Sequence, residues 1–159
     1  MTPYVFREQI LPETLLGDLA DATAFMTALP DPGDDAVEAP RMSRLAGPPK
    51  RFWSCHALAR AFLRITGDSS AWRVADGYFM RRGSEHSWLW RHVEDTVAVL
   101  DLYPVAGAAP MLVDAGGRSP WGAAYIESAM SYRQAILDTW EREADAICRA
   151  WNTVGARQP

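Results

Sequence analysis

The chain has 159 residues, of which 48% are hydrophobic and 23% are charged, values that are average for a globular domain. We therefore expect a single domain over residues 1–159, and this composition excludes collagen-like, low-complexity and disulfide-stapled proteins. Twenty acidic and sixteen basic residues leave a formal net charge of −4, which argues against nucleic-acid and membrane-surface partners, since both need a basic field.

The first residues carry no basic stretch followed by an apolar core, as a secretory signal would. No apolar run approaches the ~20 residues that a membrane-spanning helix needs. We therefore expect a cytoplasmic protein without a membrane partner. The two cysteines, Cys55 and Cys148, fall within predicted helices and are expected to be free thiols.

Residues 12–29 are predicted to form an amphipathic helix that packs on the body of the domain. Pro12 suits the first helical position, because the N–H that it lacks would have no partner there. Apolar side chains recur at intervals of three and four residues: Leu15, Leu19, Ala22, Met26 and Leu29.

Residues 30–50 are rich in proline and glycine and are predicted to be a long loop. Loops of this length are usually lids, binding loops or linkers, so a solvated loop and a lid near Cys55 both stay open. Four acids and then four bases occur in and just after this segment: Asp31, Asp34, Asp35, Glu38, Arg41, Arg44, Lys50 and Arg51. The bases precede Phe52 and Trp53, a pattern that could bind nucleic acid, but the acids compensate them and favour a solvated segment.

A second helix is predicted over residues 55–66, with Ser54 as N-cap and Gly67 as a left-handed stop. Its sequence is apolar nearly all round, which is typical of a central, mostly buried helix, and Cys55 lies in its first turn. A narrow polar stripe, in which the histidine is expected to be solvated, comprises His56, Arg60 and Arg64.

Three strand segments follow and are predicted to form an antiparallel meander: residues 72–81, 85–90 and 96–102. A hairpin loop centred between Val93 and Glu94 would place His86 directly opposite Asp101. Directly opposed Cβ atoms lie ~4.5–5.5 Å apart, a distance from which an aspartate reaches an imidazole nitrogen.

A long helical segment is predicted over residues 119–153, starting at Ser119 and Pro120. Apolar residues follow a four-three alternation that one arginine interrupts: Ile126, Met130, Arg133, Leu137, Trp140, Ala144, Ile147 and Trp151. The pattern favours a helix docked on its own domain, with a coiled-coil seam or a protein partner as the alternative.

Cys55, His86 and Asp101 are the candidate catalytic residues. A cysteine on an apolar helix is ordinarily a small core residue, but the first turn offers unpaired N–H groups that favour a thiolate. A histidine and an aspartate on neighbouring strands could supply a base and a carboxylate that orients it. The three together indicate a thiol that attacks an acyl carbon.

Four segments carry a resemblance to a known family: SCHALARAFL at 54–63, WRVADGY at 72–78, HSWL at 86–89 and VLDLYP at 99–104. Over residues 52–104 the chain resembles the transglutaminase-like branch of papain-fold cysteine enzymes. The resemblance implies an α+β fold with a papain-like (transglutaminase-like) core, in which a central helix packs on an antiparallel sheet, plus N-terminal and long C-terminal helices. It also implies Cys55 as nucleophile, His86 as general base and acid, and Asp101 as orienting carboxylate.

Some positions depart from the family pattern or carry no assigned role. Ser87 stands where the family has alanine, and two residues separate Asp101 from Pro104. The backbone N–H of Cys55 is a candidate oxyanion donor, and the indole N–H of Trp53 could assist it unless Trp53 is simply buried. Trp88 shares the predicted face of His86 and could line an aromatic cleft or pack in the core.

A zinc site that uses Cys55, His56, His86 and His92 is disfavoured. On a straight strand, rising ~3.3 Å per residue, His86 and His92 would lie about 20 Å apart. The sequence also has no Cys-x-x-Cys or His-x-x-x-His pair. We therefore expect no metal and no cofactor, and we place His92 at a hairpin corner.

The sequence thus predicts a cysteine-dependent hydrolase or acyltransferase that acts on an amide or peptide bond through a thioester intermediate. Peptidase, amidase, deamidase and transglutaminase-type acyl transfer all fit, with a peptide or amide-containing substrate. The alternative is a catalytically inactive papain-fold module that binds a peptide or protein partner through its aromatic residues and its C-terminal helix.

Overall fold

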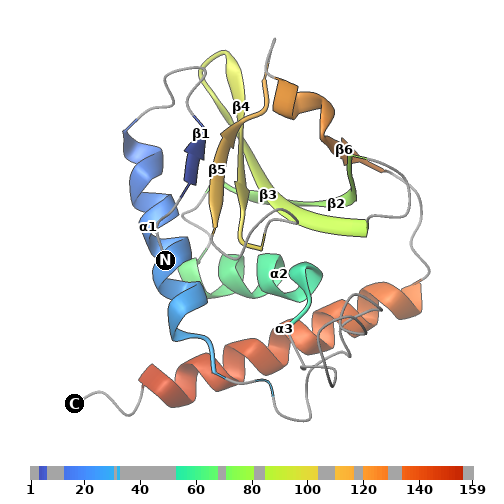
Figure 1. Ribbon diagram of the computed structural model, residues 1–159. Helices are drawn as coiled ribbons and strands as arrows, with labels where there is room; N and C mark the ends of the chain where they lie inside the picture. Colours follow the sequence, from blue (N-terminus) through green and yellow to red (C-terminus); the bar gives the residue numbers. More distant parts are fainter. Residues whose placement is uncertain are drawn as a thin grey trace, which may run out of the picture.

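The computed structural model describes residues 4–6, 13–30, 32, 53–67, 71–80, 85–103, 110–116, 120–128 and 134–155. These residues form a mixed α and β structure with three α-helices and one six-stranded sheet (Figure 1). The elements, in chain order, are β1 (Tyr4–Phe6), α1 (Thr14–Ala28), α2 (Cys55–Thr66), β2 (Arg73–Phe79), β3 (Glu85–Val93), β4 (Thr96–Asp101), β5 (Met111–Asp114), the 3-10 helix η3 (Pro120–Ala123), β6 (Tyr125–Glu127) and α3 (Gln134–Gly155). Apart from Pro30 and Pro32, the loop predicted over residues 30–50 lies outside the described residues.

The sheet has the strand order β1-β5-β4-β3-β2-β6. Strands β5, β4, β3, β2 and β6 pair antiparallel, and β1 pairs parallel to β5. The predicted meander of β2, β3 and β4 is confirmed. Three strands were not predicted: β1, β5, and β6, which falls within the segment predicted to be helical.

The predicted register of the β3–β4 hairpin is wrong. The turn consists of Glu94 and Asp95, so Val93 pairs with Thr96 and Leu89 with Leu100. Glu94 has a φ of 51°, a left-handed conformation that suits a tight two-residue turn. His86 and Asp101 are therefore not directly opposed, although the shift of two residues leaves both side chains on the same face.

The sheet buries apolar side chains on both faces. On one face, Leu89, Leu100 and Leu112 pack with α1, α2 and α3 in the larger core. The opposite face buries a smaller cluster made of Ala75, Phe79, Trp88, Val99, Met111, Val113 and Tyr125. Successive side chains of a strand point to opposite faces of the sheet, so neighbouring residues of one strand enter different cores.

Helix α2 lies between the sheet and α3, and it contacts β2 and β3 on one side and α3 on the other (Figure 1). Both predicted caps are confirmed. The side chain of Ser54 accepts a hydrogen bond from the backbone N–H of Ala57, and Gly67, at φ 79°, donates its N–H to the carbonyl of Leu63. The Ser54 cap fixes the first residue of the helix at Cys55, and the Gly67 cap ends the helix at Thr66.

The predicted helical segment over residues 119–153 is helical only in part. Within its described residues, η3 and β6 come first and α3 begins at Gln134, because Tyr125 and Ile126 pair with β2. From there on, the docked helix is confirmed, since Ala144 and Ile147 are fully buried in the larger core.

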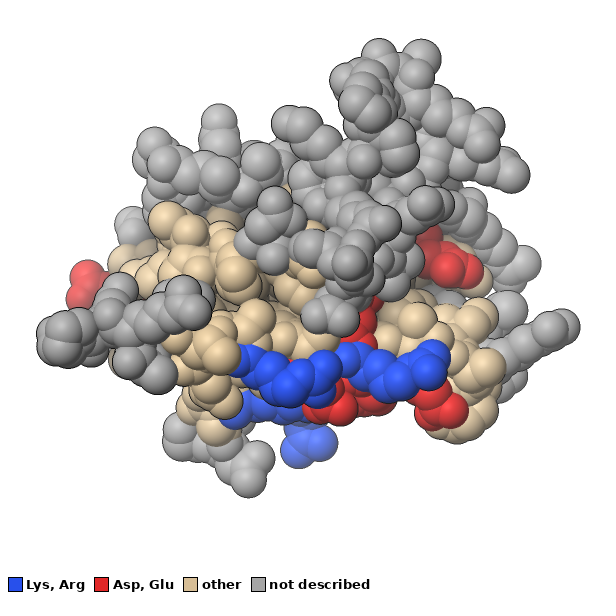
Figure 2. Space-filling model, turned by 90° about the horizontal axis from the view of Figure 1, so that it is seen from below, with Lys and Arg blue, Asp and Glu red and all other residues tan. Residues whose placement is uncertain are grey.

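Ion pairs reinforce the contact between α2 and α3. Arg64 pairs with Glu141 and with Asp145, and Arg60 with Glu141 at 3.0 Å. Viewed from the side of α3, basic and acidic side chains lie next to one another in one band (Figure 2). Because much of this band is exposed, we assign the packing energy mainly to the buried apolar residues.

Candidate active site

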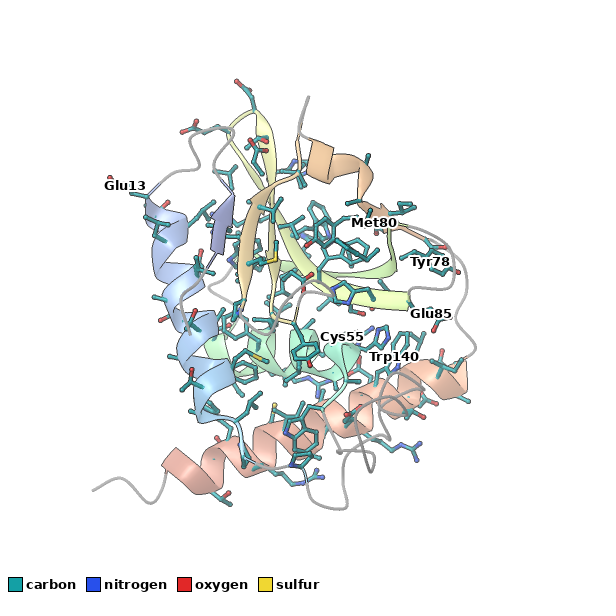
Figure 3. All side chains as sticks on the ribbon, in the orientation of Figure 1. Glu13, Cys55, Tyr78, Met80, Glu85 and Trp140 are labelled. Carbon is teal, nitrogen blue, oxygen red and sulfur yellow. The ribbon has the colours of Figure 1, made fainter. Side chains whose placement is uncertain are left out.

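Cys55 is the first residue of α2 and is half-buried. Figure 3 shows it between the sheet and α3, close to Trp140 and to the end of β3 that begins at Glu85. The other cysteine, Cys148, is also a free thiol and lies in α3 near the carbonyl of Ala61. Burial, outweighing nearby positive charge from Arg64, raises the pKa of Cys148 above its ordinary value of 9.0.

His86 and Asp101 lie side by side on β3 and β4. His86 donates from Nε2 to Oδ2 of Asp101 at 2.7 Å, and both side chains are buried. The same carboxylate oxygen accepts the hydroxyl of Tyr125 at 3.1 Å, and Oδ1 accepts the backbone N–H of Tyr103 at 3.2 Å. Three donors thus hold the Asp101 carboxylate in place, and the carboxylate in turn fixes the orientation of the imidazole ring.

The thiol of Cys55 hydrogen-bonds the ring of His86. Because Nε2 of that ring is held by Asp101, the nitrogen that faces the thiol is Nδ1. Sequence reasoning proposed these three residues, and the fold brings all three together. The contact crosses from the N-terminus of α2 to the sheet, which no local sequence pattern specifies.

The charges of Cys55 and His86 are coupled. Burial raises the pKa of Cys55, but hydrogen bonds and charge interactions with His56 and His86 outweigh it and lower the pKa to about 6. Burial lowers the pKa of His86, but the hydrogen bonds and charges of Asp101 and Cys55 outweigh it and raise the pKa to about 10. At pH 7 the pair is therefore a thiolate and an imidazolium.

Aromatic rings surround His86. Trp88 stacks beside it with ring centroids 6.1 Å apart, and Phe79 meets it edge-on at 6.2 Å. Trp88 is only 3% exposed and packs in the smaller core against Tyr125. Trp88 therefore lies against His86 within the protein interior and supports the ring.

Trp53 is not brought to the thiol as a hydrogen-bond donor. Its indole N–H donates to the carbonyl of Pro30 at 3.1 Å, and its ring is buried in the larger core. The backbone N–H of Ala57 is also engaged, by the side chain of Ser54. The N–H of Cys55 itself stays the candidate oxyanion donor.

The expectation that His56 is solvated is wrong. His56 is 9% exposed, and its ring stacks on that of Trp140 with centroids 3.8 Å apart. Its Nδ1 lies 2.7 Å from Oγ of Ser87, and the ring also hydrogen-bonds the thiol of Cys55. The polar stripe of α2 faces α3 and the sheet and is therefore covered. The sequence signal that could have placed His56 at the candidate site is its position directly after Cys55.

The hydroxyl of Ser87 connects His56 to a partly buried ion pair between Asp76 and Arg60. The hydroxyl donates to Oδ1 of Asp76, whose carboxylate accepts two N–H groups of Arg60 at 2.8 and 3.0 Å. Burial raises the pKa of Asp76, but the hydrogen bonds from Arg60 and Ser87 outweigh it and hold the pKa below 3.8. Asp76 is therefore a carboxylate at neutral pH.

The described residues contain no group of three or more His, Cys, Asp or Glu side chains that could hold a metal ion. His92, at the other end of β3 from His86, is exposed and packs edge-on against Trp90. Across the described helices, none is long and apolar enough to cross a membrane.

No family model matches the chain, and neither the curated proteins nor the solved structures gave a match.

Proposed function

We propose that this protein is a cysteine-dependent hydrolase or acyltransferase with a papain-like, transglutaminase-like core, acting on an amide or peptide bond. The observation that carries the proposal is the thiol of Cys55 at a helix N-terminus, hydrogen-bonded to a histidine that a buried aspartate orients. The mixed α and β architecture, with α2 packed on the sheet, is compatible with such a core.

In the proposed first step, the thiolate of Cys55 attacks the acyl carbon of the substrate. The negative charge that develops on the carbonyl oxygen is stabilised by the first-turn N–H groups of α2, of which the Cys55 amide is the candidate donor. His86 then gives its Nδ1 proton to the leaving amine, and the C–N bond breaks. A thioester on Cys55 and a neutral His86 remain.

In the second step, His86 accepts a proton from water or from an acceptor amine, which attacks the thioester carbon. The thiolate leaves, and the product is an acid or a new amide. Asp101 keeps the Nε2 proton directed away from the thiol throughout, so that Nδ1 alone exchanges protons with the reacting atoms. We favour water as acceptor, because no second substrate is needed.

A test uses p-nitrophenyl acetate, followed by a panel of peptide anilides. We expect acetylation of Cys55, detected by mass spectrometry, and then release of acetate with many turnovers per protein. The variants Cys55→Ala and His86→Ala should fold and show no turnover, and Cys148→Ala should retain it. Turnover that survives Cys55→Ala contradicts the proposal, and an acetyl group that never leaves Cys55 would favour the peptide-binding module.

A further inference from the structure

Cys55 has two imidazole neighbours, and the reaction above uses one. His86 approaches from the sheet, whereas His56 is the next residue of the same helix and lies against β3 and α3. Both rings are buried and both contact the thiol. The second ring calls for an explanation, because a buried histidine beside a thiol can exchange a proton with it.

The protonation pattern of His56 follows from its partners. The hydroxyl of Ser87 has one hydrogen, and that hydrogen points to Asp76. Oγ of Ser87 can therefore only accept from His56, so Nδ1 of His56 carries a proton. This leaves Nε2 as the ring nitrogen whose lone pair is available to the thiol of Cys55.

We propose that His56 is a second proton partner of Cys55, so that the nucleophile lies between two imidazole rings, each oriented by its own carboxylate. Asp101 orients His86 directly, and Asp76 orients His56 through the hydroxyl of Ser87. This inference deepens the proposed function, because the same thiol is the nucleophile there.

Either imidazole ring can take the thiol proton of Cys55. When the S–H bond of Cys55 breaks toward His56, the proton moves to Nε2, the electron pair stays on sulfur, and the ring becomes an imidazolium. Its Nδ1–H still donates to Ser87, and the Asp76 carboxylate supplies the opposite charge through that hydroxyl. The face of Trp140 stacks on the ring and keeps it in one plane.

The charged groups in the contact network around His56 come from four elements: Arg60 of α2, Asp76 of β2, His86 of β3, and Glu141 and Glu143 of α3. Arg60 also places its guanidinium over the ring of Trp140, 5.1 Å from the centroid. Because Arg60 already pairs with Asp76 and Glu141, those two carboxylates are held in place with their charges partly compensated.

The test measures alkylation of Cys55 by iodoacetamide as a function of pH, in the full chain, with Cys148 as internal reference. Mass spectrometry separates the two thiols. In His56→Phe, which keeps a ring against Trp140 but removes both nitrogens, we expect alkylation at pH 5, below the pKa of Cys55, to fall about tenfold or more, because there the thiolate fraction falls tenfold for each unit by which that pKa rises. His86→Phe should retain more alkylation than the double variant, in which both rings are replaced.

The matched control is His92→Phe, which makes the same change on β3 at an exposed histidine that does not contact Cys55 in the structure. It should leave the pH profile of Cys55 unchanged. The proposal is overturned if His56→Phe has the wild-type profile, or if His86→Phe alone is as slow as the double variant. Neither result depends on turnover, so failure here and failure of the proposed function are distinguishable.

A second measurement covers the case in which His56→Phe does not fold. The chain has three histidines, so the ring signals of ¹⁵N-labelled wild-type protein can be assigned with few variants. As Cys55 titrates, the nitrogen signals of His56 and His86 should both shift, with the proton on Nδ1 of His56 kept by its bond to Ser87. A response of His86 alone would overturn the proposal.

Discussion

The carboxylate of Glu143 in α3 accepts two hydrogen bonds from Ser54, the residue directly before Cys55. The backbone N–H of Ser54 donates to Oε1 at 2.8 Å, and its hydroxyl donates to Oε2 at 2.7 Å. Glu143 is 4% exposed and Ser54 is half-buried, so these bonds are largely shielded from solvent. They connect the C-terminal helix to the turn that carries the nucleophile.

Replacement of Glu143 by alanine should therefore destabilise the protein and loosen the turn at Cys55. Two partly buried donors of Ser54 lose their acceptor, a loss that typically costs about 1–3 kcal/mol of the free energy of unfolding. Urea denaturation of Glu143→Ala measures the cost. Glu143→Gln, which keeps one acceptor oxygen, should lose less.

The matched control for Glu143→Ala is Asp138→Ala on the exposed face of the same helix, where Asp138 accepts from Gln134. An exposed change of this kind is expected to stay within about 0.5 kcal/mol of the wild type. Equal effects of the two alanine variants would show that the contact with Ser54 contributes nothing particular to stability.

Asp101→Asn should abolish most activity while the fold is kept. The asparagine preserves the shape of the carboxyl group but removes the charge that balances the His86 imidazolium, and its amide can turn a donor toward Nε2. We expect kcat to fall by about 10²–10⁴-fold, in line with the contribution of general acid–base catalysis. Steady-state kinetics, with circular dichroism as the folding check, measures this.

Tyr125→Phe should lower kcat less than Asp101→Asn does. It removes one of the donors that hold the carboxylate and leaves the ring packed against Phe79 and Trp88. We expect a smaller loss of kcat than in Asp101→Asn, since the hydrogen bond from His86 stays. A loss as large as that of Asp101→Asn would mean that Tyr125 itself takes part in the reaction.

Gly77→Ala should displace β6. A Cβ at this position would lie 2.0 Å from the backbone oxygen of Ile126 and 3.0 Å from Cα of Glu127, and neither backbone atom can move without its strand. Overpacking of this kind costs about 1–3 kcal/mol. Because β6 carries Tyr125, which donates to Asp101, activity should fall together with the melting temperature.

The control for this glycine is Gly17→Ala in α1. Nothing lies within 4 Å of a Cβ built there, and the position is an exposed one inside a helix. Alanine should therefore stabilise the protein by up to about 1 kcal/mol, through the better helix propensity. Destabilisation by both substitutions would refute the argument that the space around Gly77 decides its effect.

Much of the core around the site could be predicted because its signals are local. The caps of α2 are set by Ser54 and Gly67, and the strand pattern indicated β2, β3 and β4. The predicted register of the β3–β4 hairpin differs from the observed one by two residues. Several consecutive polar residues could form this turn, so the sequence does not define its position. A shift of two leaves side chains on the same face, so His86 and Asp101 still meet, now diagonally.

The remainder depends on tertiary packing, which the sequence pattern did not reveal. His56 looked solvated because it lies on a polar stripe with Arg60, yet α3 and the sheet cover that stripe. Likewise, Ile126 matched the helical alternation of the C-terminal segment, but pairing with β2 makes it part of a strand. In both cases a distant element decides the local environment.

The pH dependence of kcat/KM should be bell-shaped and wide, because the attack needs a thiolate on Cys55 and the leaving group needs a proton on His86. The lowered pKa of Cys55, about 6, makes the thiolate accumulate as the pH rises through 6. The raised pKa of His86, about 10, keeps the ring protonated until the pH rises through 10. Activity on a peptide anilide should therefore rise near pH 6, stay level, and fall near pH 10. An activity limb near pH 9, where an ordinary thiol titrates, would mean that the two groups do not form an ion pair in the free protein.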